Sequence, residues 1–142
     1  MEMGYKTKFG PDGKVDRHKA RLVAKGFSQV EGIDYTETFS PIAKMNSICL
    51  ALSLVASFKW EFHQMDVKSA LLHGYLHDQI YMDQTPIFIQ NESSLVFRLR
   101  RSLYGLKQAP RAWYAKMGRF LLDNGFYRCH FENTLYSKKV GK

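Results

Sequence analysis

The chain has 142 residues, enough for one domain or part of a larger domain. Hydrophobic residues make up 45% of it and aromatic residues 14%, so the sequence can bury a core and is not disordered by composition. The formal net charge of +8 favours an acidic partner, and nucleic acid is the leading class. A membrane surface is the weaker alternative, because no lipidation motif or basic amphipathic helix stands out.

Two further patterns concern the cellular compartment. Residues 1–6 lack the apolar core of a signal peptide, and the most apolar segment, 48–58, is too short to span a bilayer. Cys49 and Cys129 form neither a disulfide framework nor a metal-ligand spacing, which is typical of a reducing compartment. The sequence therefore predicts an intracellular protein with no membrane partner.

The first predicted element is a β-hairpin over residues 5–30. Its turn is Pro11-Asp12-Gly13, where proline presets φ and glycine supplies a positive φ. Cations line both arms of the hairpin, at Lys6, Lys8, Lys14, Arg17, Lys19, Arg21 and Lys25. On composition alone, these side chains make a solvated edge that discourages aggregation.

A loop is expected over residues 31–39, followed by a buried helix over 42–57. Ser40 is a suitable N-cap, and Pro41 suits the first helical position. The helix is apolar nearly all round, which predicts burial in a core. We expect it to serve as scaffold for the rest of the domain.

A lone carboxylate, Asp66, stands near the end of segment 60–67, whose partial alternation predicts an inner strand. An acid at the exit of a half-buried strand is costly unless a cation satisfies it. Mg²⁺ suits this role, because it prefers oxygen ligands and often takes one or two carboxylates plus substrate phosphates. The small residues Ser69 and Ala70 would let a ligand approach the backbone. On this stretch alone, an aspartate that caps a turn is the more common arrangement.

The remaining chain predicts short strands and one amphipathic helix. The strands are expected over 79–82, 95–100 and 134–137, with a turn at 91–94, and the helix runs from Pro110 to Asn124-Gly125. Between Arg98 and Arg119 the chain holds seven basic residues and no acid. A solvated helix face explains part of this density, but the interleaved aromatic residues favour contact with a nucleic-acid backbone.

Four motifs stand in a fixed order along the chain: residues 19–29 (KARLVAKGFSQ), 39–45 (FSPIAKM), 64–70 (QMDVKSA) and 102–114 (SLYGLKQAPRAWY). Together with residues 80–84 they closely resemble the reverse transcriptase of copia-type LTR retrotransposons, and the resemblance covers nearly the whole chain. It implies an α+β fold, the fingers and partial palm of a right-hand polymerase, with an antiparallel sheet and helices packed on one side. About 1–40 would be the fingers hairpin and loop. About 41–142 would be fingers and palm, truncated before the second catalytic motif.

The resemblance also implies roles for particular residues. Asp66 would be the catalytic aspartate, and together with the Val67 carbonyl it would bind Mg²⁺. At Leu71 the family usually has an aromatic residue, whose ring blocks the 2′-hydroxyl of a ribonucleotide. The expected nucleotide-binding residues are Lys19, Arg21, Ser69, Ala70, Leu71, Tyr104 and Gly105, and the expected nucleic-acid contacts are Lys107, Gln108 and Arg111.

The paired aspartates of the family's second catalytic motif have no counterpart, since no two acidic residues are adjacent in this chain. Polymerase chemistry uses two metal ions held by carboxylates from two motifs. We therefore expect a polyprotein fragment that is inactive alone. Its partners would be an RNA template, a DNA primer, a dNTP and the absent remainder of the polyprotein. By resemblance, it would work in a cytoplasmic virus-like particle or in the nucleus. The alternatives are a non-catalytic module that binds RNA or RNA–DNA duplex, or a chain that does not fold stably alone.

Overall fold

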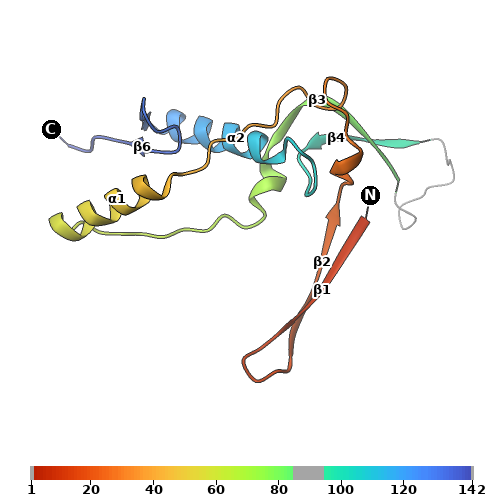
Figure 1. Ribbon diagram of the computed structural model, residues 1–142, viewed down its shortest axis with the longest axis horizontal. Helices are drawn as coiled ribbons and strands as arrows, with labels where there is room; N and C mark the ends of the chain where they lie inside the picture. The colour runs from red at the N-terminus through yellow and green to blue at the C-terminus, as the bar shows by residue number, and fades with distance from the viewer. Residues whose placement is uncertain (1, 85–94, 142) are drawn as a thin grey trace.

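The computed structural model describes residues 2–84 and 95–141 (Figure 1). The chain has an α+β fold in which all paired strands are antiparallel. Its elements are β1 (Glu2–Phe9), β2 (Val15–Val23), α1 (Met45–Phe58), β3 (Tyr75–Asp83), β4 (Val96–Arg101), α2 (Ala109–Asp123), β5 (Tyr127–Arg128) and β6 (Tyr136–Ser137), with short 3₁₀ helices at Gly26–Ser28 and Ala70–His73.

The strands form three separate two-stranded sheets, β1–β2, β3–β4 and β5–β6. The predicted antiparallel pairing is confirmed, but the single sheet with helices on one side is wrong for the described residues. α2 packs on the 3₁₀ helix at 70–73 and on β3. Strands β3 and β4 include the predicted segments 79–82 and nearly all of 95–100, whereas the turn expected at 91–94 lies outside the described residues.

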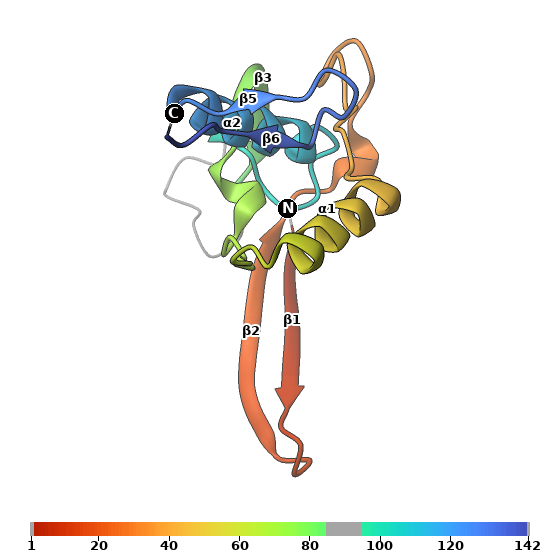
Figure 2. The ribbon, with the colours of Figure 1, turned by 90° about the vertical axis from the view of Figure 1, so that its left-hand side faces the viewer.

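The predicted hairpin forms, although its second strand ends at Val23 rather than near residue 30, and it extends from the body of the molecule (Figures 1 and 2). Gly13 supplies the positive φ, +74°, and its N–H donates to the Gly10 carbonyl over 3.0 Å. Because directly opposed residues share a face, the register separates two kinds of side chain. One face carries Glu2, Lys6, Lys8, Arg17, Lys19, Arg21 and Val23, and the other carries Met3, Tyr5, Thr7, His18, Ala20 and Leu22.

Segment 60–67 has no strand, so the prediction of an inner strand is wrong. Alternation indicates a strand only where a neighbouring strand supplies hydrogen bonds, and no described strand pairs with this segment. Trp60 stacks on Phe58 with ring centroids 5.3 Å apart. Met65 is 88% exposed, so the apolar side chains of the segment are not covered.

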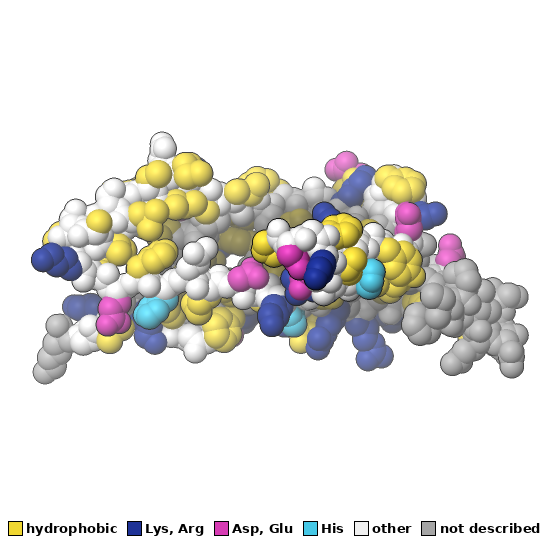
Figure 3. Space-filling view, turned by 90° about the horizontal axis from the view of Figure 1, so that it is seen from below, with side chains coloured by type: hydrophobic (Ala, Val, Ile, Leu, Met, Phe, Trp, Pro, Cys, Tyr) yellow, Lys and Arg dark blue, Asp and Glu magenta, His cyan; other side chains and the backbone are white. Residues whose placement is uncertain are grey.

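Helix α1 forms, but it begins at Met45 rather than at Ser40-Pro41, and none of its residues is buried. Ser40 does not cap the helix, because its hydroxyl donates to the Pro110 carbonyl over 3.4 Å. The predicted burial is therefore wrong among the described residues. Hydrophobic side chains gather over the end of the molecule that holds α1 (Figure 3). Neither described helix is long and apolar enough to cross a lipid bilayer.

Helix α2 confirms the predicted helix from Pro110, which lies in its first turn. Gly125 follows its C-terminal end with φ +78°, the left-handed conformation that glycine adopts without steric cost. The first turn of α2 lies against the core, whose buried members are Ala24, Ile80, Leu106 and Ala109, with Leu71, Leu76, Met82, Leu99 and Leu103 packed around them.

This core is small for the chain. The accessible surface is 11909 Å², whereas a compact monomer of this mass exposes about 7,600 Å². Only five hydrophobic residues of the described chain are buried. The part of the structure around Ile80 and α2 is therefore packed, while α1 lies largely open to solvent.

The difference in packing gives a stability prediction. We expect Ile80→Ala, at a site 5% exposed, to lower the free energy of unfolding by about 2–5 kcal/mol. Leu50→Ala removes a side chain that is 62% exposed, so we expect a change within about 0.5 kcal/mol. Urea unfolding measures both variants. Equal losses would contradict the assignment of α1 as an uncovered helix.

Glu132 attaches α1 to the C-terminal part of the chain. The Ser47 hydroxyl donates to its carboxylate over 3.0 Å, and the Thr134 hydroxyl donates over 2.8 Å. The hydrogen bond from Thr134, followed by that from Ser47, lowers the pKa of Glu132 below its ordinary value. This contact therefore stabilises the ionised form of Glu132.

A pH dependence follows from this lowered pKa. A carboxylate with a depressed folded-state pKa stabilises the fold above its unfolded pKa and loses that contribution as pH falls through the folded value. We expect Glu132→Gln to lower the Tm by a constant amount above the ordinary glutamate pKa, and the difference from wild type to shrink as pH falls below it. Thermal melts over a pH series measure this. A difference that is the same at all pH values would contradict it.

Candidate nucleotide and nucleic-acid site

A groove of about 700 Å³ lies between β2, segment 66–72 and the loop that precedes α2. We call it the Asp66 groove. Its lining residues are Arg17, His18, Lys19, Ala20, Arg21, Leu22, Asp66, Val67, Lys68, Ser69, Leu72, Leu103 and Tyr104. Three segments far apart in the sequence thus meet here. They bring together six of the predicted site residues: Lys19, Arg21, Asp66, Val67, Ser69 and Tyr104.

The charges that line the Asp66 groove are mostly positive. Asp66 is its single carboxylate, and four cations accompany it, namely Arg17, Lys19, Arg21 and Lys68. Arg17 also lies 3.6 Å from the carboxylate of its neighbour Asp16. The sequence analysis did not single out Arg17 or Lys68 as site residues. For Arg17 a signal was present, because Arg17, Lys19 and Arg21 alternate along one face of a strand.

Arg21 is held beside Tyr104. Its guanidinium carbon lies 5.6 Å from the centre of the Tyr104 ring, within the range of a cation–π contact. The backbones of the two segments are joined nearby: Val23 forms a bridge with Tyr104, and the Ala24 N–H donates to the Tyr104 carbonyl over 2.7 Å. The backbone therefore fixes where Arg21 emerges relative to the ring.

Two glycines allow this close approach. Gly105 has φ +91°, and a Cβ there would collide with the Ala24 carbonyl. A Cβ on Gly26 would in turn collide with the Gly105 carbonyl. Gly105 was predicted to bind nucleotide. The structure places it at this backbone contact rather than among the residues that line the groove.

Asp66 is exposed on the groove, and the segment that follows it is conformationally special. Ser69 adopts φ +54° and ψ 35°, a left-handed conformation that is uncommon outside glycine. It leads into the 3₁₀ helix at 70–73, which packs on α2. Ala70 and Leu71 do not line the groove, and Leu71 packs against the core cluster instead.

Lys107 and Gln108 end the loop that precedes α2. Neither lines the Asp66 groove, and both bind other groups of the protein. Gln108 is 3% exposed. It accepts a hydrogen bond from the Gln29 amide over 3.1 Å and donates to the Asp34 carbonyl over 3.0 Å. The Lys107 ammonium donates to the Gln29 carbonyl and the Tyr35 hydroxyl, each over 3.2 Å. These contacts tie loop 29–35 to the start of α2.

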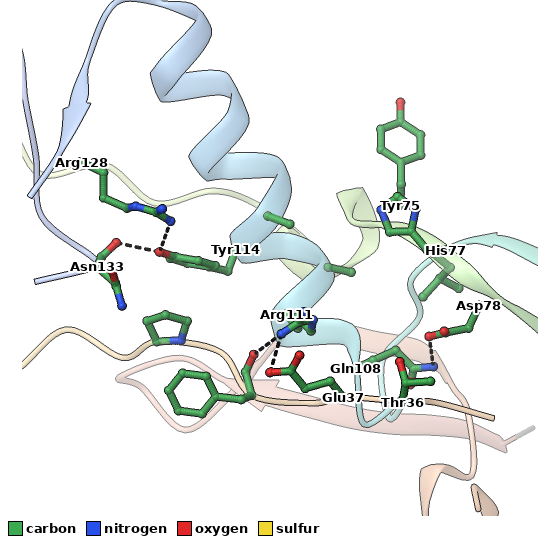
Figure 4. Close-up of a pocket in the computed structure, with 15 residues that line it drawn as sticks. Thr36, Glu37, Tyr75, His77, Asp78, Gln108, Arg111, Tyr114, Arg128 and Asn133 are labelled. Carbon is green, nitrogen blue, oxygen red and sulfur yellow. Dashed lines mark hydrogen bonds and ion pairs between the residues drawn. The ribbon is translucent and has the colours of Figure 1, made fainter. Parts of the chain in front are cut away.

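Arg111 lines a second pocket, of about 610 Å³, between loop 36–41, β3 and α2 (Figure 4). Its guanidinium lies 2.8 Å from the Glu37 carboxylate and donates to the Phe39 carbonyl over 3.4 Å. Tyr114, one turn further along α2, donates to the Asn133 carbonyl over 2.7 Å. Arg111 is thus paired within the protein. Sequence reasoning missed its partner Glu37, because no local pattern joins the two.

A family model described as reverse transcriptase (RNA-dependent DNA polymerase) matches residues 3–142. The chain belongs to this reverse transcriptase family. It is 44% identical over 139 residues to the retrovirus-related Pol polyprotein from transposon RE2 of Arabidopsis thaliana, and 46% identical over 139 residues to that from transposon TNT 1-94 of Nicotiana tabacum. Each alignment covers 97% of this chain and 10% of the polyprotein.

A more distant relative is the transposon Ty1-ER2 Gag-Pol polyprotein of Saccharomyces cerevisiae, 31% identical over 110 residues, or 74% of this chain and 6% of that polyprotein. The chain thus spans a tenth or less of the length of these relatives. No solved structure matches it. The predicted resemblance to copia-type reverse transcriptases is confirmed, and by ancestry the chain is part of an RNA-directed DNA polymerase.

Reverse transcriptases use a divalent metal, so the donor set of this chain can be tested for one. Among the described residues, no group of three His, Cys, Asp or Glu side chains could hold an ion. The Asp66 groove offers one carboxylate amid four cations. This donor set fits Mg²⁺ only when phosphate oxygens and water supply its other ligands, which is how proteins commonly bind Mg²⁺.

The contact between the two glycines gives a further prediction. We expect Gly26→Ala to lower the free energy of unfolding by about 1–3 kcal/mol, because the added Cβ forces two backbone segments apart. Gly4→Ala, in the adjacent hairpin, is the matched control, since a Cβ there meets its nearest atom at an ordinary 3.8 Å. Urea unfolding compares the two. We call this contact between Gly26 and Gly105 the hairpin joint. A loss for Gly4→Ala as large as that for Gly26→Ala would contradict its close packing.

Proposed function

We propose that this chain provides the incoming-nucleotide side of an RNA-directed DNA polymerase, and that the Asp66 groove takes the triphosphate. The observation that carries the proposal is the meeting of Asp66, Lys19 and Arg21 in one groove. Arg21 presents a planar fork that pairs two phosphate oxygens, and Lys19 adds a point charge beside it. The small residue Ser69 leaves the backbone open to the ligand.

Mg²⁺ belongs to this proposal as a complex with the triphosphate. The Asp66 carboxylate and the Val67 carbonyl would hold the ion, which polarises phosphoryl oxygens when bound. The cations of the groove would keep the phosphates in place. The 142 residues contain no adjacent acidic pair for a second ion. We therefore propose that the chain binds nucleotide but does not join nucleotides by itself.

The finer architecture follows from the family. We propose that residues 1–40 act as polymerase fingers and 41–142 as fingers and part of the palm. The partners would be an RNA template, a DNA primer and the other parts of a Pol polyprotein inside the cell. Tyr104 and Gly105 would lie where the template base meets the nucleotide.

The second candidate function is binding of RNA or RNA–DNA duplex without catalysis, which the hairpin favours. On its cationic face, Lys6 lies opposite Lys19 and Lys8 lies opposite Arg17. Like charges directly opposite each other destabilise a sheet. A polyanion laid along this face would relieve the repulsion, so the ribbon suits a nucleic-acid backbone beyond the groove.

The nucleotide proposal is tested by titrating a dNTP with Mg²⁺ into the purified chain. We expect Lys19→Gln/Arg21→Gln to weaken binding by about tenfold or more, since each charged hydrogen bond contributes about 1.5–3 kcal/mol. Lys14→Gln/Lys25→Gln removes the same charge from positions just before and just after β2 that do not line the groove, and serves as the control. Asp66→Asn should remove the dependence of binding on Mg²⁺.

Two results would contradict this proposal. Equal weakening in both double variants would show that the overall charge of the hairpin, not the groove, binds the nucleotide. Primer extension by the wild-type chain, abolished in Asp66→Ala, would disprove its inactivity. RNA binding without nucleotide binding would favour the second candidate function.

A further inference from the structure

A second cationic cluster lies at the start of β3. Two cations approach the ring of Tyr75: the Arg101 guanidinium carbon lies 5.6 Å from the ring centre, and the Lys116 ammonium lies 5.1 Å from it. We call these three residues the Tyr75 cluster. Tyr75 is 54% exposed, and Arg101 is also exposed. None of the three lines the Asp66 groove.

The two cations of the Tyr75 cluster have no acidic partner in the described part of the chain. Neither Arg101 nor Lys116 forms an ion pair there. The surrounding sequence offers none, since residues 93–122 contain no Asp or Glu. The ring attracts each cation, but the two cations repel each other. An anion that contacts both cations would offset this repulsion.

The Tyr75 cluster is held by packing of three elements rather than by mobile side chains alone. Tyr75 is paired with Arg101 across the β3–β4 sheet. Next to them, the Ser102 N–H donates to the Gly74 carbonyl over 2.9 Å, and a Cβ on Gly74 would collide with the backbone of α2. The helix that carries Lys116 is thus fixed against the strand that carries Tyr75.

Tyr75 is one of the residues that line the pocket between β3 and α2, but its ring points away from the other lining side chains (Figure 4). The paired Arg111 and Glu37 lie in that pocket, whereas the Tyr75 cluster presents its charges outside it. An extended ligand could reach it without displacing any hydrogen bond or ion pair of that pocket. The positive charge of the Tyr75 cluster favours an anion that can contact both cations. Phosphate suits this role because it has several acceptor oxygens.

We propose that the Tyr75 cluster is a phosphate-binding site for a strand of nucleic acid, separate from the Asp66 groove. Arg101 and Lys116 contact a backbone phosphate, and Tyr75 positions both cations. The net charge of +8 draws a polyanion to the surface, and the cluster provides a defined point of contact. Contacts of this kind carry no base preference, so binding is independent of sequence.

The experiment measures binding of a fluorescent single-stranded RNA to the full chain over a series of salt concentrations. For a single strand, each phosphate contact contributes about 0.7 to the slope of log K against log salt. Because both cations contact the same phosphate, we expect Arg101→Gln/Lys116→Gln to reduce the slope by about 0.7 and the affinity at low salt by about tenfold. Circular dichroism checks that each variant keeps its helix content.

The matched control is Arg100→Gln/Arg119→Gln. It takes one cation from β4 and one from α2, changes the net charge equally, and leaves the cations over Tyr75 in place. We expect it to leave the slope nearly unchanged. Equal reductions in both double variants would overturn the proposal in favour of a diffuse basic surface.

Two more measurements separate the roles. Tyr75→Leu keeps both charges, so we expect weaker RNA binding with an unchanged salt slope; wild-type affinity would overturn the positioning role of the ring. Inorganic phosphate at constant ionic strength should not displace the RNA, and displacement would assign the cluster to a small free anion. Nucleotide binding in the Asp66 groove should survive Arg101→Gln/Lys116→Gln. The two proposals can therefore fail independently.

Discussion

The candidate site depends on one contact between backbones, where the hairpin meets the loop before α2. At Gly26 and Gly105 the two segments approach so closely that no Cβ fits, and the Ala24 N–H bonds to the Tyr104 carbonyl. Backbone contacts of this kind set the direction of β2 whatever side chains surround them. The contact of Arg21 with the Tyr104 ring contributes only about 0.5–1 kcal/mol at an exposed site. It is therefore a consequence of the hairpin joint between Gly26 and Gly105, not the interaction that holds the two segments together.

Polar contacts hold the body of the chain together where its core is thin. Gln108 and Lys107 bind loop 29–35, and Arg111 binds Glu37, so the irregular chain between the hairpin and α1 lies against α2. Among the described residues, the side chains of α1 make no such polar contact with the rest of the chain beyond the one to Glu132. Regions with few buried apolar contacts open at lower free energy than the packed core. The hairpin joint and α2 therefore form the rigid part of the structure, and α1 the weaker part.

The sequence predicted those features whose cause is local. The hairpin turn needs only Gly13 at a positive φ, and α2 needs only Pro110 at its start and Gly125 after its end. The sequence did not predict features that depend on a partner far away along the chain. Segment 60–67 alternates like a strand but has no described strand to pair with, and Ser40 binds the Pro110 carbonyl instead of capping a helix. Lys107 and Gln108 suited an anion by residue type, yet their partners are loops that no pattern in the chain connects to them.

Asp66 lies beside the predicted residues Lys19 and Arg21 even though the strand predicted to carry it does not form. Asp66 reaches the groove although segment 60–67 is no strand, because the residues after it are fixed independently. Ser69 turns the chain through a left-handed conformation, and the 3₁₀ helix at 70–73 packs on α2. α2 in turn begins just after the loop that contains Gly105. The carboxylate is thus positioned from its C-terminal side, by the same joint that positions Arg21, and this common origin explains how both reach one groove.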